Sequence, residues 1–204
     1  MKRKILVATT NPGKMAELSA MLDADVQWVS LADFPDVPEV KEDGETFAEN
    51  ARKKASGYAH ATGLWTIADD SGLVIDALNG APGIHSARFS GDKPDKADRT
   101  LIDDRNIEKV LKLMKDTPTE NRTARFVCSL CAASPEEILI ETTGTFEGQI
   151  ATEKQGHNGF GYDPIFYIPH LAKTVAQIDA NEKNKISHRA KAITQLKPQL
   201  AKLL

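Results

Sequence analysis

The chain reads WTIADDSGLVI over residues 65–75. Its first four residues, Trp65 to Ala68, predict a short strand. At the expected carboxyl end of that strand stand Asp69-Asp70-Ser71-Gly72, followed by a second apolar run, Leu73 to Ile75. In open α/β sheets, ligands bind at the carboxyl ends of the strands. The stretch therefore predicts an α/β fold with an acidic site at the edge of its sheet.

Strand and helix patterns extend from this stretch in both directions. The apolar run Lys4 to Ala8 predicts a first strand, and a helix follows from Lys14 because Met15, Leu18 and Leu22 fall on one face. A capping box, Thr46 to Glu49, predicts a helix that ends near Gly63. The other expected elements are a strand at 26–31, an irregular excursion at 33–45, a helix at 101–114, an antiparallel pair at 123–132 and 138–145, and a last helix that carries Ile193, Leu196, Leu200 and Leu203 and is kinked at Pro198.

Composition limits the classes of protein that this chain can be. Its 204 residues are 41% hydrophobic, so it can bury a core as one domain or as one domain with a lobe. The formal net charge is -3, which makes polymeric DNA or RNA an unsuitable partner. The apolar run behind the basic N-terminus is too short for a signal sequence, and no run reaches the roughly 20 residues of a membrane span. We expect a cytoplasmic protein.

The two cysteines, Cys128 and Cys131, form a C-x-x-C pattern that could indicate a redox or zinc site. Residues 125–132 predict a strand, however, and positions three apart in a strand point to opposite faces. No second cysteine pair or histidine couple completes a zinc set. We therefore expect two buried and inert thiols.

The acid pair offers a ligand for a hard cation. Mg²⁺ usually takes one or two carboxylates together with substrate phosphate oxygens. Because adjacent strand residues point to opposite faces, Asp69 and Asp70 can share a site only where the strand ends, so one of them is expected to act. An aspartate that merely caps a turn is an equally good interpretation of this pentapeptide alone.

Three further polar segments could bind a nucleotide. Thr9-Thr10-Asn11-Pro12-Gly13-Lys14 links a strand to a helix and could present N–H groups and a lysine to an anion, although it is not a Walker A loop and could be an ordinary turn. Gly159-Phe160-Gly161-Tyr162-Asp163 could stack a base or pack as a glycine-rich turn. The cluster at 182–189 gathers cations and an imidazole, or is a polar helix entrance.

Taken together, the segments closely resemble the inosine triphosphate pyrophosphatase family, which hydrolyses non-canonical purine nucleoside triphosphates. The resemblance spans nearly the whole length. The matching motifs lie at 10–14 with Glu17, at 44–51, at 69–73, at 80–88, at 159–164 and at 187–189. His85 departs from the tyrosine expected in this family. The resemblance implies a mixed twisted sheet flanked by helices, with two lobes and a central cleft, all within one pyrophosphatase domain over 1–204.

The resemblance also implies roles for individual residues. Asp70 would be the catalytic carboxylate and a Mg²⁺ ligand, and Glu42 would be the second ligand, with Glu39, Asp43 and Glu45 as neighbouring alternatives. Lys14 would bind the phosphates, with Lys54 as a further phosphate ligand. The full set of implied substrate-binding residues is Thr9, Thr10, Asn11, Pro12, Gly13, Lys14, Ser71, Phe160, Gly161, Tyr162, Asp163, Lys183, His188 and Arg189.

The implied reaction is hydrolysis of ITP, dITP or XTP to the monophosphate and pyrophosphate by a homodimer. His188, Arg189 and the backbone near Phe160 would read the base. Two alternatives remain. One is a pyrophosphatase of the related Maf-like group, which prefers pyrimidine or modified nucleotides. The other is a regulator that binds a nucleotide without cleaving it.

Overall fold

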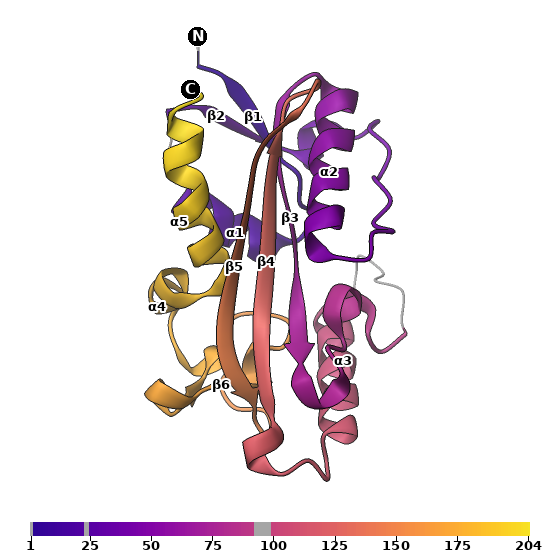
Figure 1. The fold of residues 1–204 in the computed structure, drawn as a ribbon, viewed down its shortest axis with the longest axis vertical. Helices are drawn as coiled ribbons and strands as arrows, with labels where there is room; N and C mark the ends of the chain where they lie inside the picture. The colour runs from indigo at the N-terminus through magenta and orange to yellow at the C-terminus, as the bar shows by residue number, and fades with distance from the viewer. Residues whose placement is uncertain (1, 23–24, 92–98) are drawn as a thin grey trace. The chain divides into compact units, whose positions relative to one another are not determined.

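The computed structural model describes residues 2–22, 25–91 and 99–204. These residues form a seven-stranded sheet in the order β2-β1-β3-β4-β5-β6-β7 (Figure 1). Strand β1 pairs in parallel with β2 and β3, whereas β6 pairs antiparallel with β5 and β7. The predicted mixed α/β class is therefore confirmed. The strands are β1 Lys4–Val7, β2 Gln27–Ser30, β3 Trp65–Ile75, β4 Thr123–Ala133, β5 Ile138–Ile150, β6 Phe166–Ile168 and β7 Lys173–Thr174.

The helices are α1 Pro12–Met21, α2 Phe47–Thr62, α3 Arg99–Leu113, α4 Ala180–Ile186 and α5 His188–Ala201. The chain divides into two compact units. The first comprises Met1–Ser71, Cys128–Thr145 and His188–Leu204, and the second comprises Gly72–Val127 and Phe146–Ser187. Strands β3, β4 and β5 each contribute residues to both units. A single domain with two lobes and a cleft remains a prediction.

In the first unit, the central strands β1, β3 and β4 are buried on both faces. Strand alternation sends Ile5, Val7 and Ile67 into one cluster, where they meet apolar residues of α1 and α5. Leu6 and Ala68 enter the opposite cluster, which α2 covers (Figure 1). The two cysteines divide between these clusters, and both are buried and free. The prediction of buried thiols on opposite faces is confirmed, and their lack of reactivity remains a prediction.

In the second unit, one apolar cluster supports the remaining elements. Helix α3 contributes Ile107 and Val110, which pack with residues of β3, β4 and β5. Phe126 of β4 stacks on Phe166 of β6 with ring centroids 4.3 Å apart. This core holds the ends of the strands from which the 76–91 and 151–165 segments depart.

The boundary of β3 differs from the prediction. The strand does not end at Ala68 but continues through Asp69 and Asp70 to Ile75. The apolar residues that follow the acid pair prolong the extended backbone, and Leu73 and Ile75 are fully buried. The acid pair therefore lies inside a strand rather than at its end.

The C-terminal helix also differs from the prediction. The expected polar entrance is a separate helix, α4, which begins after Asp179 caps the Glu182 N–H at 2.9 Å. Ser187 is extended and separates α4 from α5, so His188 opens the last helix. That helix ends at Ala201, and Leu203 lies beyond it with 41% of its surface exposed. The predicted place of Leu203 on the apolar face is wrong because the helix ends first.

Two helix starts are set by local capping. Helix α1 begins at Pro12, earlier than predicted, because the side-chain Oδ1 of Asn11 accepts the N–H groups of Gly13 and Lys14. Helix α2 begins after Thr46, as the sequence predicts, and ends at Gly63 with a φ of 69°. The capping box is only half formed, since the Glu49 carboxylate accepts the N–H of Glu45. None of the helices in the described ranges is long and apolar enough to cross a membrane.

Candidate active site

The two aspartates of β3 face opposite sides of the sheet. Because the backbone is still extended at 69 and 70, their side chains diverge. Asp69 meets Lys14 of α1 and Arg189 of α5. Asp70 meets Asn50 and Lys54 of α2. The structure thus separates the acid pair into two distinct environments within the first unit.

Asp69 is buried in a cationic environment. Its Oδ2 lies 3.0 Å from Lys14 Nζ and 3.1 Å from an Arg189 guanidinium nitrogen, and it accepts the Ser71 hydroxyl at 3.2 Å. Burial opposes ionisation of Asp69, but the charges of Lys14, Arg189 and Lys54 outweigh it and hold the pKa far below the usual value. A carboxylate that is ionised and already engaged by cations is suited to holding other side chains in place.

Arg189 is a central member of this cluster. Its side chain is only 1% exposed, and its guanidinium binds Glu17, Asp69 and the Ser71 hydroxyl. The guanidinium therefore connects α1, β3 and α5. The resemblance implies that Arg189 reads the base directly, whereas the structure places it in the carboxylate network. His188 precedes it, is buried, and is the first residue of α5, with Ser187 between it and α4.

Asp70 has a different set of partners. Asn50 Nδ2 donates to Asp70 Oδ2 at 3.0 Å, and the Ser71 N–H donates to Oδ1 at 3.0 Å. Burial raises the pKa of Asp70 above its usual value, and the charge of Glu42 adds to this, although Lys54 and Lys14 oppose it. A nearby cation would stabilise the ionised form of such a carboxylate.

Lys54 is a cation that lies next to both proposed metal ligands. Its Nζ is 3.0 Å from Glu42 Oε2 and 3.9 Å from Asp70 Oδ1. Burial disfavours its charge, but Asp69, Glu42 and Asp70 outweigh burial and raise the pKa of Lys54. Glu42 and Asp70 therefore share one positive neighbour in the first unit.

The other acidic candidates near Glu42 are directed elsewhere. Asp43 is exposed and binds Lys41 and Lys53, which lower its pKa to about 2 by hydrogen bonding and charge. Glu39 and Glu45 are also exposed. The geometry favours Glu42 among the four acids that the sequence left open.

The donor set fits a magnesium ion better than a metal that needs a protein cage. No group of three or more His, Cys, Asp or Glu side chains gathers as a cage within 2–22, 25–91 and 99–204. Mg²⁺ is commonly held by one or two carboxylates, with substrate phosphates and water completing its coordination. Asp70 and Glu42, which both lie within 4 Å of the Lys54 ammonium, offer two carboxylates of this kind.

Asn50 is a residue of this site that the sequence interpretation did not single out. It is 1% exposed, and while its amide nitrogen binds Asp70, its carbonyl accepts the Gly44 N–H at 2.8 Å. A Cβ atom on Gly44 would lie 2.8 Å from that carbonyl oxygen, so glycine permits the approach. Asn50 thereby links Asp70 to the segment that carries Glu42. The only signal was its place in the 44–51 motif.

The segment from Thr9 to Lys14 differs in detail from an anion-binding turn. The Asn11 side chain occupies the N–H groups of Gly13 and Lys14, and the Thr9 hydroxyl accepts the Asn11 N–H at 3.2 Å. The positive charge of this segment is the Lys14 ammonium, which lies against Asp69 and is partly exposed. Thr10 and Pro12 are exposed.

In the second unit, the 159–163 segment forms a compact platform. Lys183 Nζ lies 4.5 Å from the centre of the Phe160 ring and 2.6 Å from Asp163 Oδ2. The same Asp163 oxygen accepts the Phe160 N–H at 2.9 Å. Gly159 has a φ of 78°, and a Cβ there would collide with the Asp163 carboxylate. Five predicted residues are thus brought together in one cluster: Phe160, Gly161, Tyr162, Asp163 and Lys183.

Tyr162 connects the platform to another motif. Its hydroxyl donates to the Ser86 carbonyl at 2.8 Å, and the Ser86 hydroxyl accepts the Leu73 N–H at 2.9 Å. Burial raises the pKa of Tyr162 far above its usual value, so the phenol is a stable donor. The 80–88 motif therefore supports the platform. His85, the residue that departs from the resemblance, is exposed.

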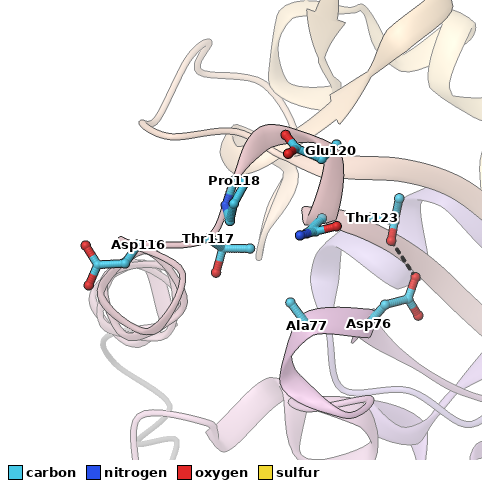
Figure 2. A pocket seen from close by; sticks show the side chains of 8 residues that line it. Asp76, Ala77, Asp116, Thr117, Pro118, Glu120 and Thr123 are labelled. Carbon is cyan, nitrogen blue, oxygen red and sulfur yellow. Dashed lines mark hydrogen bonds between the residues drawn. The ribbon is translucent and has the colours of Figure 1, made fainter.

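A shallow hollow elsewhere in the second unit has no such organisation. Asp76, Asp116 and Glu120 lie on its rim, but Figure 2 shows their carboxylates apart from one another. Asp76 is bound by the Thr123 hydroxyl at 2.7 Å and by Arg125. This hollow contains none of the predicted site residues.

Comparisons with known proteins identify the family of this chain. The model of the Ham1 family matches residues 5–199. This chain belongs to the Ham1 family. The dITP/XTP pyrophosphatase of Listeria monocytogenes serotype 4b (strain F2365) is 46% identical over 202 residues, which are 98% of this chain and 96% of that protein. The dITP/XTP pyrophosphatase of Halalkalibacterium halodurans is 49% identical over 192 residues, 94% and 95% of the two chains.

Solved structures of Ham1 proteins share the fold. The HAM1 protein of Coxiella burnetii superposes with a TM-score of 0.86 at 40% identity and covers 98% of this chain and 99% of its own. The Staphylococcus aureus Ham1 protein gives a TM-score of 0.85 at 41% identity, with 99% and 100% covered. The resemblance stated from the motifs is therefore confirmed as membership of the Ham1 family.

Proposed function

We propose that this Ham1 protein hydrolyses dITP and XTP to the corresponding monophosphate and pyrophosphate. The observation that carries the proposal is the similarity, over nearly the full length, to proteins named dITP/XTP pyrophosphatases at 46% and 49% identity. The pair of carboxylates around Lys54 supplies the chemistry that such a reaction needs. Asp70 is the catalytic carboxylate in this proposal.

The residues of the first unit are assigned to the triphosphate. Asp70 and Glu42 would hold Mg²⁺, which offsets negative charge on phosphate oxygens when bound. Lys54 and Lys14 offset further charge, and Asn50 orients the Asp70 carboxylate. Asp70 orients the attacking water. The water oxygen bonds to the α-phosphorus and its proton passes to the solvent. The bond from that phosphorus to its bridging oxygen breaks, and pyrophosphate leaves with the bridging oxygen.

The residues of the second unit are assigned to the base. The Phe160 ring offers a face for stacking, and Lys183 and Asp163 offer polar contacts to a purine. A site built to hydrogen-bond a 6-keto group discriminates against a 6-amino group, because polar atoms would be left without partners. The resemblance also assigns His188, a residue of the first unit, to the base. Arg189 acts by holding Asp69, Ser71 and Glu17 in place.

The substrate assay decides between this activity and its alternatives. The protein is incubated with Mg²⁺ and separately with dITP, XTP, dATP, dGTP, dTTP and UTP, and both pyrophosphate and orthophosphate are measured. We expect pyrophosphate from dITP and XTP. Preference for dTTP or UTP would favour a Maf-like activity, and binding without turnover would favour a regulator. In water labelled with ¹⁸O, the label should enter the monophosphate, because attack at the β-phosphorus would place it in pyrophosphate.

Two substitutions test the carboxylates. Asp70→Asn should reduce kcat by about a thousandfold or more while the far-UV circular dichroism spectrum is unchanged. Glu42→Gln should raise the Mg²⁺ concentration needed for half-maximal rate, whereas Asp43→Asn, the matched control on the next residue, should not. Full activity in Asp70→Asn, or equal effects of the Glu42 and Asp43 variants, would contradict the assignment.

The resemblance further implies a homodimer, and we include this assembly and a cytoplasmic location in the proposal. Light scattering of the purified protein should give twice the mass of one chain. A monomer mass at micromolar concentration would contradict the dimer without affecting the proposed reaction.

A further inference from the structure

We propose that Asp103 of α3 is a positioning residue for the base platform, defined as the segment Gly159–Asp163, and that it acts through a hydrogen bond to the Gly161 N–H. This inference rests on the proposed function of the platform. It adds a residue from outside every motif that the sequence interpretation used. The Asp103 carboxylate accepts the Gly161 N–H at 2.8 Å.

The geometry of Gly161 explains why an acceptor is needed there. Gly161 has a φ of 59°, a left-handed conformation that its lack of a side chain allows. This conformation directs its N–H to α3 instead of to a neighbour within the platform. A carboxylate acceptor makes a stronger hydrogen bond than a neutral carbonyl. Asp103 therefore stabilises the turn at Gly161, the residue that follows Phe160 in the chain.

Two other hydrogen bonds that hold the platform are made by Phe160 and Tyr162 and do not involve the Gly161 N–H. Asp163 accepts the Phe160 N–H at the start of the turn, and the Tyr162 hydroxyl binds the Ser86 carbonyl on the far side. Gly161 lies between these two anchors. A segment with two glycines loses much conformational entropy when it is ordered. The hydrogen bond from Gly161 to Asp103 orders the segment before the substrate binds. Less conformational entropy is then lost on binding, so the base binds more tightly.

The neighbouring acid on the same helix supplies a matched control. Asp104 Oδ1 lies 2.7 Å from Lys154 Nζ, and both side chains of this ion pair are substantially exposed. Exposed pairs of this kind contribute little to stability. Asp104→Ala removes a carboxylate and an ion pair from α3 without removing a contact to the platform. It therefore separates a positioning effect from a general effect on the helix.

The experiment compares ligands with and without a base. In Asp103→Ala, the KM for dITP and the inhibition constant of dIMP should both rise by about tenfold, which corresponds to the loss of one hydrogen bond to a charged group. The inhibition constant of tripolyphosphate, which has no base, and kcat should change less than about twofold, since the platform is not assigned to the phosphates. Asp103→Asn should recover most of the loss because its carbonyl still accepts the Gly161 N–H.

Hydrogen exchange tests the same contact independently of turnover. A peptide covering 158–166 should exchange its amide hydrogens faster in Asp103→Ala than in Asp104→Ala or the unsubstituted protein. Equal effects of the two alanine variants, or an equal rise for dIMP and tripolyphosphate, would overturn the proposal. If the unsubstituted protein does not hydrolyse dITP, the proposed function fails, and the exchange result still decides whether Asp103 orders the platform.

Discussion

At the scale of single residues, the acid pair shows how strand geometry divides chemical roles. Asp69 and Asp70 are adjacent in sequence, yet the pKa of Asp69 is lowered and that of Asp70 is raised. Burial favours the neutral form of both carboxyl groups, but the cations around Asp69 outweigh it there. Arg189 and Lys14 surround Asp69, whereas Asp70 meets the neutral amide of Asn50 and one lysine. Two identical side chains thus become a structural and a candidate catalytic carboxylate.

The two cysteines give a prediction at this scale. Burial raises the pKa of the Cys128 and Cys131 thiols to about 12. At pH 8 only about one thiol in ten thousand would then be ionised, and the thiolate is the reactive form. We expect the folded protein to react with Ellman's reagent over hours, and the protein in guanidinium chloride to release two equivalents within minutes. A fast reaction of either thiol in the folded protein would contradict this.

At the scale of elements, α2 is the helix whose ends the sequence predicts best. The Thr46 hydroxyl accepts the Glu49 N–H at 3.1 Å, and Gly63 ends the helix in the left-handed region. Between these caps, α2 positions Asn50 and Lys54 four residues apart, so that both face Asp70. The local caps therefore determine the register of two residues of the candidate site.

The C-cap provides a prediction at this scale. A Cβ at Gly63 would meet no atom within 4 Å, so the cost of Gly63→Ala is conformational and not steric. We expect Gly63→Ala to lower the free energy of unfolding in urea by about 1–2 kcal/mol. Gly63→Asn should lower it less, because asparagine tolerates this conformation. Equal losses in the two variants would indicate that the left-handed backbone is not the cause.

At the scale of the whole molecule, buried carboxylates determine the response to acid. The charges of Lys14 and Arg189 hold the folded-state pKa of Asp69 far below its usual value despite burial. Its stabilising contribution is therefore present above the unfolded value and is lost as the pH falls through the folded value. Asp70 and Asp103 have raised pKa values, so their contributions have the opposite sign: they are present at low pH and are lost as the pH rises through the folded values.

The lowered pKa of Asp69 predicts how the free energy of unfolding depends on pH. We expect Asp69→Asn to be less stable than the unsubstituted protein at pH 7, because Lys14 and Arg189 lose a buried counter-charge. The gap in the free energy of unfolding should narrow as the pH falls from about 5 toward 2, where Asp69 protonates in the unfolded chain. Urea unfolding followed by circular dichroism at several pH values measures the gap. A gap that stays constant with pH, or one equal to that of Asp104→Asn, would show that Asp69 is not the group responsible.

The sequence by itself determined the features that depend on near neighbours. Hydrophobic periodicity and capping residues predicted α1, α2, α3 and most strands, and the Asp69-Asp70 motif with its companions identified the family. These signals are local because a helix or strand is formed by contacts within a few residues. The continuation of β3 and the separate α4 escaped this reasoning, because polar residues at 69–72 and 182–187 fit a loop as well as an element.

Only the tertiary structure decided which polar residues meet. Arg189 and Asp69 are separated by 120 positions, and Asp103 and Gly161 by 58. Asn50 is 20 positions from Asp70. No periodicity or spacing reports such pairs, because they depend on which helix covers which face of the sheet. The physical reason is that a buried charge or N–H group is unfavourable unless it has a partner. Only the folded chain brings these distant partners within hydrogen-bonding distance.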